Sequence, residues 1–144
     1  MTLDIESKVE QEASIESVEI VVVGAGMCGI SCAAGLKHFG IDNFIILEKG
    51  NTINHFWKNL CYDRMSMHTP WHDLPFDHGL VYQYPQMKDK HQFTEYLQKY
   101  ANKYQLSPHI KFNKKVVKID KNPSSNKWIL TTEDNTVYES SYLC

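Results

Sequence analysis

Residues 19–48 read EIVVVGAGMCGISCAAGLKHFGIDNFIILE, and this stretch decides the fold. The β-branched run at residues 20–23 predicts a parallel strand that is buried on both faces. Apolar residues at helical spacing then predict a helix over about residues 28–38, which Gly40 ends, and residues 44–47 predict a second strand. A strand, a helix and a strand within about 30 residues form a βαβ unit with a right-handed crossover. The sequence therefore predicts an α/β fold built on a parallel sheet.

Three glycines lie at the junction of the first strand and the helix. Gly24, Gly26 and Gly29 spell GxGxxG, and Glu48 closes the next strand 19 residues after Gly29. The first glycine permits a tight turn, the second lets the backbone approach a pyrophosphate, and the third lets helix and strand pack closely. Free amides at the start of the helix stabilise phosphate charge. Since turns also use glycine for purely structural reasons, the flanking strand, helix and Glu48 are what favour a dinucleotide site.

Glu48 narrows the choice of dinucleotide. Its carboxylate can accept hydrogen bonds from an adenosine ribose but would repel a 2'-phosphate, which favours FAD or NAD over NADP. A simple dehydrogenase would continue with another α-crossover. Here residues 49–86 form a long aromatic loop, a helix is expected over about residues 89–104, and short β-like runs separated by turns follow from residue 110. This layout predicts a Rossmann-like FAD-binding βαβ parallel sheet with an antiparallel β-meander insertion.

The end of the chain is expected to be incomplete. The last residues, SYLC, have the pattern of another apolar strand that begins where the chain stops. An unpaired strand exposes an edge that invites aggregation, so we expect poor solubility.

The composition is that of one ordinary globular domain, with 144 residues, 42% of them apolar, and 15 basic against 17 acidic residues. Six of the acidic residues lie before residue 20, which predicts an acidic flexible tail over residues 1–18 and a domain portion over residues 19–144. Lys114 and Lys115 are the one pair of adjacent basic residues after this tail, too few for a nucleic-acid partner.

The start of the chain lacks a basic segment followed by an apolar core, so neither a signal nor a transit peptide is expected and a cytoplasmic location is the default. The apolar window at residues 19–36 is too short and too rich in glycine to span a membrane, and no transmembrane segment is predicted. The four cysteines are expected to be reduced, with Cys28 and Cys32 buried on one helix face. The histidines fit no standard ligand spacing, and no metal is predicted.

Four stretches of the sequence together resemble a known protein family. The resemblance rests on residues 24–50, on FWKN at 56–59, on CYDRMSMHTP at 61–70 and on YPQMKDKHQFTEYLQKYANKYQL at 84–106. This ordered set is similar to the amino-terminal part of flavin-containing monooxygenases, above all the plant-type indole-3-pyruvate (YUCCA-type) branch.

The resemblance implies an FAD- and NADPH-dependent enzyme. NADPH would reduce FAD, molecular oxygen would add at the flavin C4a, and the hydroperoxide would transfer one oxygen atom to a small N-, S- or keto-acid substrate. It assigns cofactor-binding roles to ten residues and catalytic roles to none. Gly24, Ala25, Gly26 and Gly29 would hold the FAD pyrophosphate, Glu48 the ribose, Phe56 and Trp57 the flavin, His68 and Thr69 the flavin and nicotinamide, and the Val117 backbone the adenine.

Two departures from the family pattern keep alternatives open. Asn54 and His55 stand where many members have Gly-Gly, and the chain has no second GxGxxG for NADPH. The NADPH site is therefore expected in a missing carboxy-terminal part. The alternative is a non-catalytic FAD-binding fragment or interaction module. The FAD half of a disulfide-reductase-like flavoprotein is a weaker alternative, because neither CxxC nor CxxxxC occurs.

Overall fold

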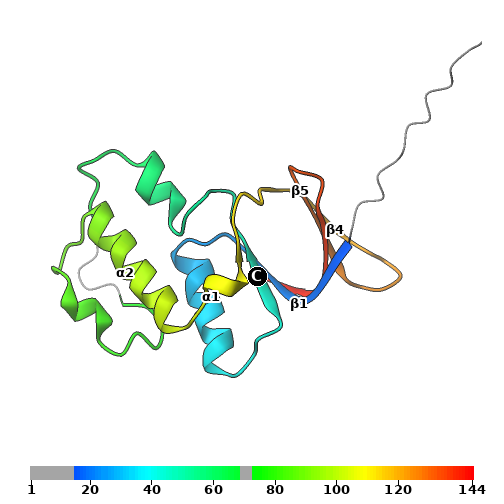
Figure 1. The fold of residues 1–144 in the computed structure, drawn as a ribbon, viewed down its shortest axis with the longest axis horizontal. Helices are drawn as coiled ribbons and strands as arrows, with labels where there is room; N and C mark the ends of the chain where they lie inside the picture. Colours follow the sequence, from blue (N-terminus) through cyan, green and yellow to red (C-terminus); the bar gives the residue numbers. More distant parts are fainter. Residues whose placement is uncertain (1–14, 69–72) are drawn as a thin grey trace, which may run out of the picture.

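The computed structural model describes residues 15–68 and 73–144. Six strands form one sheet in the order β3-β2-β1-β6-β5-β4 (Figure 1). The elements in chain order are β1 (Ile15–Val23), α1 (Met27–His38), β2 (Phe44–Leu47), a π-helical turn η1 (Phe56–Leu60), a 3-10 turn η2 (Leu80–Gln83), α2 (Lys90–Lys103), a 3-10 turn η3 (Ser107–His109), β3 (Ile110–Lys111), β4 (Val116–Lys121), β5 (Trp128–Thr132) and β6 (Val137–Leu143).

The predicted βαβ unit is confirmed. β1 pairs in parallel with β2 over Ile20↔Phe44 to Val23↔Leu47, and α1 joins the two strands. β1 pairs in parallel with β6 on its other side, while β4, β5 and β6 are antiparallel. The chain therefore has the expected α/β fold, with a parallel sheet that continues into an antiparallel meander.

The first strand is longer than its β-branched run. Ile15 already pairs with Val137, and the pairing continues to Val18 with Ser140. The assignment of residues 15–18 to a flexible tail is therefore wrong, and residues 1–14 of that tail lie outside the described residues. This part of the strand could not be recognised locally, because its partner lies about 120 residues away in the chain.

Two further expectations about strands are corrected. Ile110–Lys111 was expected to open the meander, but β3 pairs in parallel with β2 at the far edge of the sheet. The final SYLC is not the start of a new strand, since residues 141–143 end β6 and Cys144 exchanges backbone hydrogen bonds with Val21 and Val23 at 2.9 Å. β6 lies between β1 and β5, so it is not the exposed edge that the sequence predicted.

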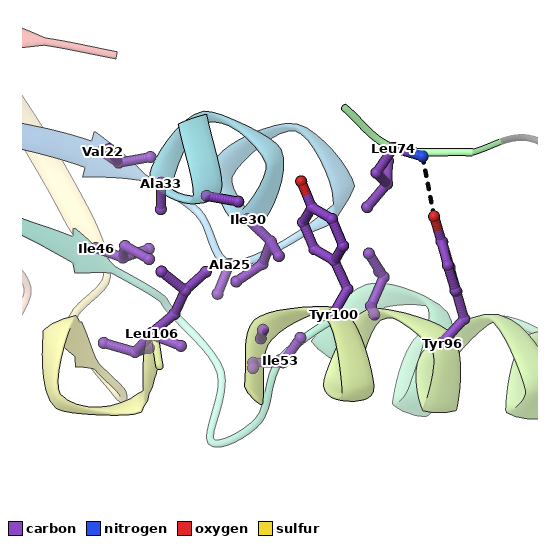
Figure 2. Close-up of a cluster of buried hydrophobic side chains, with 14 of the residues drawn as sticks. Val22, Ala25, Ile30, Ala33, Ile46, Ile53, Leu74, Tyr96, Tyr100 and Leu106 are labelled. Carbon is purple, nitrogen blue, oxygen red and sulfur yellow. Dashed lines mark hydrogen bonds between the residues drawn. The ribbon is translucent and has the colours of Figure 1, made fainter. Parts of the chain in front are cut away.

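The helices cover one face of the parallel strands. Ile30, Ala33 and Ala34 of α1 pack with Val22 and Ile46 of the sheet, and α2 adds Phe93, Tyr96, Leu97, Tyr100 and Ala101 to the same core. In Figure 2 the rings of Tyr96 and Tyr100 rise from α2 toward Leu74 and Ile30. A smaller core of Val21, Leu47, Leu130 and Tyr138 lies on the other face.

α2 also holds the long aromatic loop in place. Asp89 caps the helix by accepting from the amides of His91 and Gln92, and the Gln92 side chain accepts from the Asp89 amide, which completes a capping box. The Tyr96 hydroxyl accepts from the Leu74 amide at 2.9 Å (Figure 2) and donates to the buried Asp77 carboxylate at 2.8 Å. The amphipathic stripe predicted for residues 89–104 therefore packs as core.

Within residues 15–68 and 73–144, we find no helix that combines the length and the apolar character needed to cross a membrane.

The expected burial of the cysteines on α1 is wrong for Cys28, which is exposed, while Cys32 is half-buried.

A substitution within α1 tests how closely this helix packs against its neighbours. Gly35 has helical neighbours on both sides, and a Cβ added there would meet nothing within 4 Å. Because alanine is favoured over glycine in a helix interior by about 1 kcal/mol, we expect Gly35→Ala to raise the free energy of unfolding by about that amount. Urea unfolding followed by circular dichroism measures it, and a loss of stability would mean that α1 lies closer to a neighbour than described.

Candidate dinucleotide site

The glycine turn is held by close backbone contacts at the carboxyl end of β1. Gly24 adopts a φ of 96°, which favours glycine, and its amide donates to the Leu47 carbonyl at 2.8 Å. A Cβ on Gly29 would lie 1.9 Å from the Gly24 carbonyl oxygen and 3.4 Å from Cγ1 of Val22. The first turn of α1 can therefore rest on the glycine turn only when residue 29 lacks a side chain.

Glu48 is bonded to the glycine turn directly. One oxygen of its carboxylate accepts from the Ala25 amide at 2.7 Å, and the other accepts from the Gly50 amide at 2.7 Å. The residue is only 5% exposed. A carboxylate has about four acceptor positions, so two amides still leave capacity for further donors. Glu48 therefore joins the ends of β1 and β2 and keeps acceptor capacity at the site.

The start of α1 carries no competing negative charge. In the described part of the chain no side chain caps α1, whose N-cap is Gly26, and its first turn contains no acidic residue. A Cβ on Gly26 would meet nothing within 4 Å, so the space beside this residue is open. The first-turn amides and the helix dipole thus favour an anion there.

A cavity of about 130 Å³ opens beside Glu48. It is lined by the ends of β1 and β2 and by the segment that leads into β4: Val23, Gly24, Leu47, Glu48, Lys49, Lys114, Lys115 and Val116. Lys114 is paired with Asp134, and Lys115 with Glu133 at 2.9 Å. The Lys114 ammonium and the Thr132 hydroxyl hold the pKa of Asp134 well below its usual range. Sequence reasoning noted the two lysines only as a basic pair and missed their place at this cavity.

Val117 lies next to the cavity but does not line it. The pairing of β4 with β5 shifts register between Val116 and Lys118, so Val117 sits at a β-bulge, with its side chain 54% exposed. A bulge leaves the extra residue unpaired in the ladder. This fits a binding role for the Val117 backbone and indicates no role for its side chain.

Asn54 ties the aromatic loop to the glycine turn. Its amide donates to the Ala25 carbonyl at 2.9 Å, and its side-chain Nδ2 donates to Thr94 Oγ1 of α2 at 3.0 Å. The residue is 3% exposed and has a φ of 57°. Asparagine tolerates this left-handed conformation, which glycine also adopts readily. Asn54 therefore keeps a backbone conformation suited to the Gly-Gly of the family pattern, and its side chain adds the hydrogen bond to Thr94.

Two substitutions separate the contribution of the Asn54 side-chain bond from that of its left-handed backbone conformation. Asn54→Gly keeps the left-handed backbone and loses only the bond to Thr94, so we expect a loss of about 1 kcal/mol in the free energy of unfolding. Asn54→Ala adds backbone strain and should cost about 1 kcal/mol more. Urea unfolding of both variants tests the order, and equal losses would exclude a contribution from the backbone.

The predicted aromatic residues, two and three positions after Asn54, differ in exposure. Phe56, the first residue of η1, is 57% exposed, whereas Trp57 packs on Phe93 of α2 with ring centroids 5.1 Å apart.

His68 is exposed and follows Met67, whose amide donates to the Lys88 carbonyl at 2.8 Å. The residues just before His68 therefore pair with the segment that leads into α2. Thr69 lies outside the described residues.

No three His, Cys, Asp or Glu side chains come together as metal ligands in the segments 15–68 and 73–144. Five of the ten predicted site residues, Gly24, Ala25, Gly26, Gly29 and Glu48, are brought together by the structure.

Known proteins resemble this chain in sequence. Residues 21–144 match the family model described as pyridine nucleotide-disulphide oxidoreductase. The chain is 36% identical over 125 residues to "Probable indole-3-pyruvate monooxygenase YUCCA1" of Arabidopsis thaliana, covering 85% of this chain and 29% of that protein.

Solved structures have the same fold. Cyclohexanone monooxygenase from Rhodococcus sp. Phi1 bound to NADP+ superposes with a TM-score of 0.81 at 22% identity, over 90% of this chain and 25% of that one. A complex of OTEMO with FAD and NADP superposes with a TM-score of 0.75 at 19% identity, over 88% of this chain and 25% of that one.

The chain belongs to the pyridine nucleotide-disulphide oxidoreductase family, a class of oxidoreductases. Within it, the resemblance to the flavin monooxygenases drawn from the motifs is confirmed, since the relatives are indole-3-pyruvate monooxygenases. The chain spans less than a third of the length of the curated relatives that it matches.

Proposed function

We propose that this chain is the FAD-binding first segment of an FAD- and NADPH-dependent monooxygenase that inserts one oxygen atom into a small organic substrate. The observation that carries the proposal is the bond between Glu48 and the Ala25 amide at 2.7 Å, which joins the glycine turn to the end of β2. The monooxygenase relatives support the reaction class.

The residues at the site fit the adenosine diphosphate half of FAD. The open space beside Gly26 and the uncapped start of α1 suit a pyrophosphate, which needs close backbone approach and amide donors. Glu48 would accept from the ribose hydroxyls through its remaining acceptor positions, and the cavity bounded by Lys115 and Val116 would take the adenine end. Val117 would contact the adenine through its backbone at the bulge.

The chain's own residues bind and orient. When bound, FAD would supply the redox chemistry of an NADPH- and oxygen-dependent reaction. Phe56, with its exposed ring, would shield the flavin from water, while Trp57 anchors η1 on α2 so that this ring keeps its place. His68 and Thr69 would complete the polar side of the flavin and nicotinamide sites. No residue of the chain is proposed as a catalytic acid or base.

The NADPH site and the substrate pocket would be supplied by sequence beyond these residues. One GxGxxG motif occurs in the chain, and the monooxygenase relatives are more than three times as long as the part that matches. The second candidate function, a non-catalytic FAD-binding module, is favoured by this single motif. Both candidates predict FAD binding by this chain, and they differ in whether the whole protein consumes NADPH.

FAD binding is tested with Gly26→Ala and with Gly35→Ala as the matched control. Since a Cβ at either position meets nothing within 4 Å, both variants should fold. A Cβ at residue 26 would enter the space proposed for the pyrophosphate, so we expect FAD affinity to fall at least tenfold, equivalent to about 1.4 kcal/mol, while Gly35→Ala binds as the wild type does. Quenching of FAD fluorescence measures both.

The same chain also tests whether a nicotinamide site lies within these residues. Retained flavin without NADPH oxidation under air is expected for the 144-residue chain in either case, and NADPH oxidation would mean that a nicotinamide site exists within it. A wild-type chain that folds but retains no flavin after desalting would contradict the proposal.

A further inference from the structure

Two cysteines that lie far apart in the sequence meet on the helix-covered face of the sheet. Cys144 sits opposite Val22, because its amide donates to the Val21 carbonyl and its carbonyl accepts from the Val23 amide, both at 2.9 Å. Opposite residues of parallel strands point to the same face, and Val22 belongs to the core under α1. Cys144 therefore faces α1.

Cys32 reaches the same point from the helix. Gly29 lies against Val22, with 3.4 Å between its Cβ position and Val22 Cγ1, and Cys32 follows three residues later on the same helix face. Cys32 packs against the edge of this core, and the neighbouring Cys144 thiol contributes to raising its pKa. Figure 1 shows the carboxyl end of the chain beside α1.

We propose that Cys32 and Cys144 form an intramolecular disulfide when the chain meets a low-molecular-weight disulfide, so that α1 becomes linked to the strand end beside β1. Cys28 is one helical turn earlier and exposed, which leaves it as a matched bystander. The inference is independent of the proposed function, since it rests on the packing of α1 alone.

Exposure sets the order of the steps. Cys144 is exposed and Cys32 is half-buried, and burial together with the neighbouring thiol raises the pKa of Cys32 to about 11. The Cys144 thiolate therefore attacks the small disulfide first, forming a mixed disulfide and releasing one small thiol. Cys32 then attacks the Cys144 sulfur and releases the second small thiol. The two protein thiols lose two protons and two electrons, and the small disulfide gains both.

The test uses two double variants incubated with glutathione disulfide. C28S/C61S keeps Cys32 and Cys144, whereas C32S/C61S keeps Cys28 and Cys144. We expect the first to lose about 2 Da and to give a Cys32–Cys144 linked peptide, and the second to stop at a glutathione adduct or to close at least tenfold more slowly. Acid quenching, intact mass and non-reducing peptide mapping give the rates.

The wild-type chain provides a second measurement that does not depend on the variants. In the native state we expect the Cys32–Cys144 link, while in urea the links should scatter among the four cysteines. Because the link closes a loop of about 110 residues, the oxidised chain should melt roughly 15 °C higher. Equal closure of both double variants, a native Cys28–Cys144 link, or a lower Tm after oxidation would overturn the proposal.

Discussion

Gly29→Ala is expected to lower the free energy of unfolding by about 3 kcal/mol and to abolish FAD binding. The added Cβ would lie 1.9 Å from the Gly24 carbonyl oxygen, and backbone cannot rotate away as a flexible side chain could. Either α1 must move off β1 or the glycine turn must open, and both changes displace the uncapped amides at the start of the helix.

Gly35→Ala in the same helix is the control, because it makes the identical chemical change where nothing lies within 4 Å. Urea unfolding and FAD titration of both variants measure the difference, which we expect to reach about 4 kcal/mol once the helix propensity gained at residue 35 is included. A Gly29→Ala chain with wild-type stability would show that α1 does not rest on the glycine turn as described.

Glu48→Ala is expected to cost about 3 kcal/mol of stability in addition to FAD affinity. The substitution leaves the amides of Ala25 and Gly50 without their acceptor in a buried setting, and each unsatisfied donor costs about 1–3 kcal/mol. Glu48→Gln should fall between alanine and the wild type, because an amide side chain offers one oxygen to two donors.

Glu133→Gln provides the control for the loss of a carboxylate. Glu133 pairs with Lys115 at 2.9 Å, but its side chain is 66% exposed, and an exposed pair contributes about 1 kcal/mol at most. Urea unfolding of the three variants gives the ranking. If Glu48→Gln matched the wild type in stability, the role of Glu48 would be limited to the ligand.

Local patterns were sufficient for the elements that surround the site. α1, β2 and α2 lie within one residue of their predicted bounds, since hydrophobic periodicity and the glycine that follows α1 are signals between neighbours in the chain. GxGxxG and Glu48 were recognised in the same way. What the motif could not reveal is that Glu48 is already bonded to two backbone amides.

The strand predictions that failed depend on a distant partner. β3 belongs to the parallel edge because it pairs with β2, about 60 residues earlier, and β6 is an interior strand because β1 lies beside it. The same reason applies to Asn54, which sequence reasoning noted only as a departure from the family, and whose bonds reach Ala25 and Thr94.

The amino-acid pattern alone thus decides that a strand, a glycine turn and a helix follow one another and that a carboxylate ends the next strand. Such features depend on interactions across a few residues. Tertiary structure alone decides which strand lies beside β1, which amide the Glu48 carboxylate binds across the sheet, and that Cys32 lies near Cys144. Each of these contacts joins residues that only the packed sheet brings together.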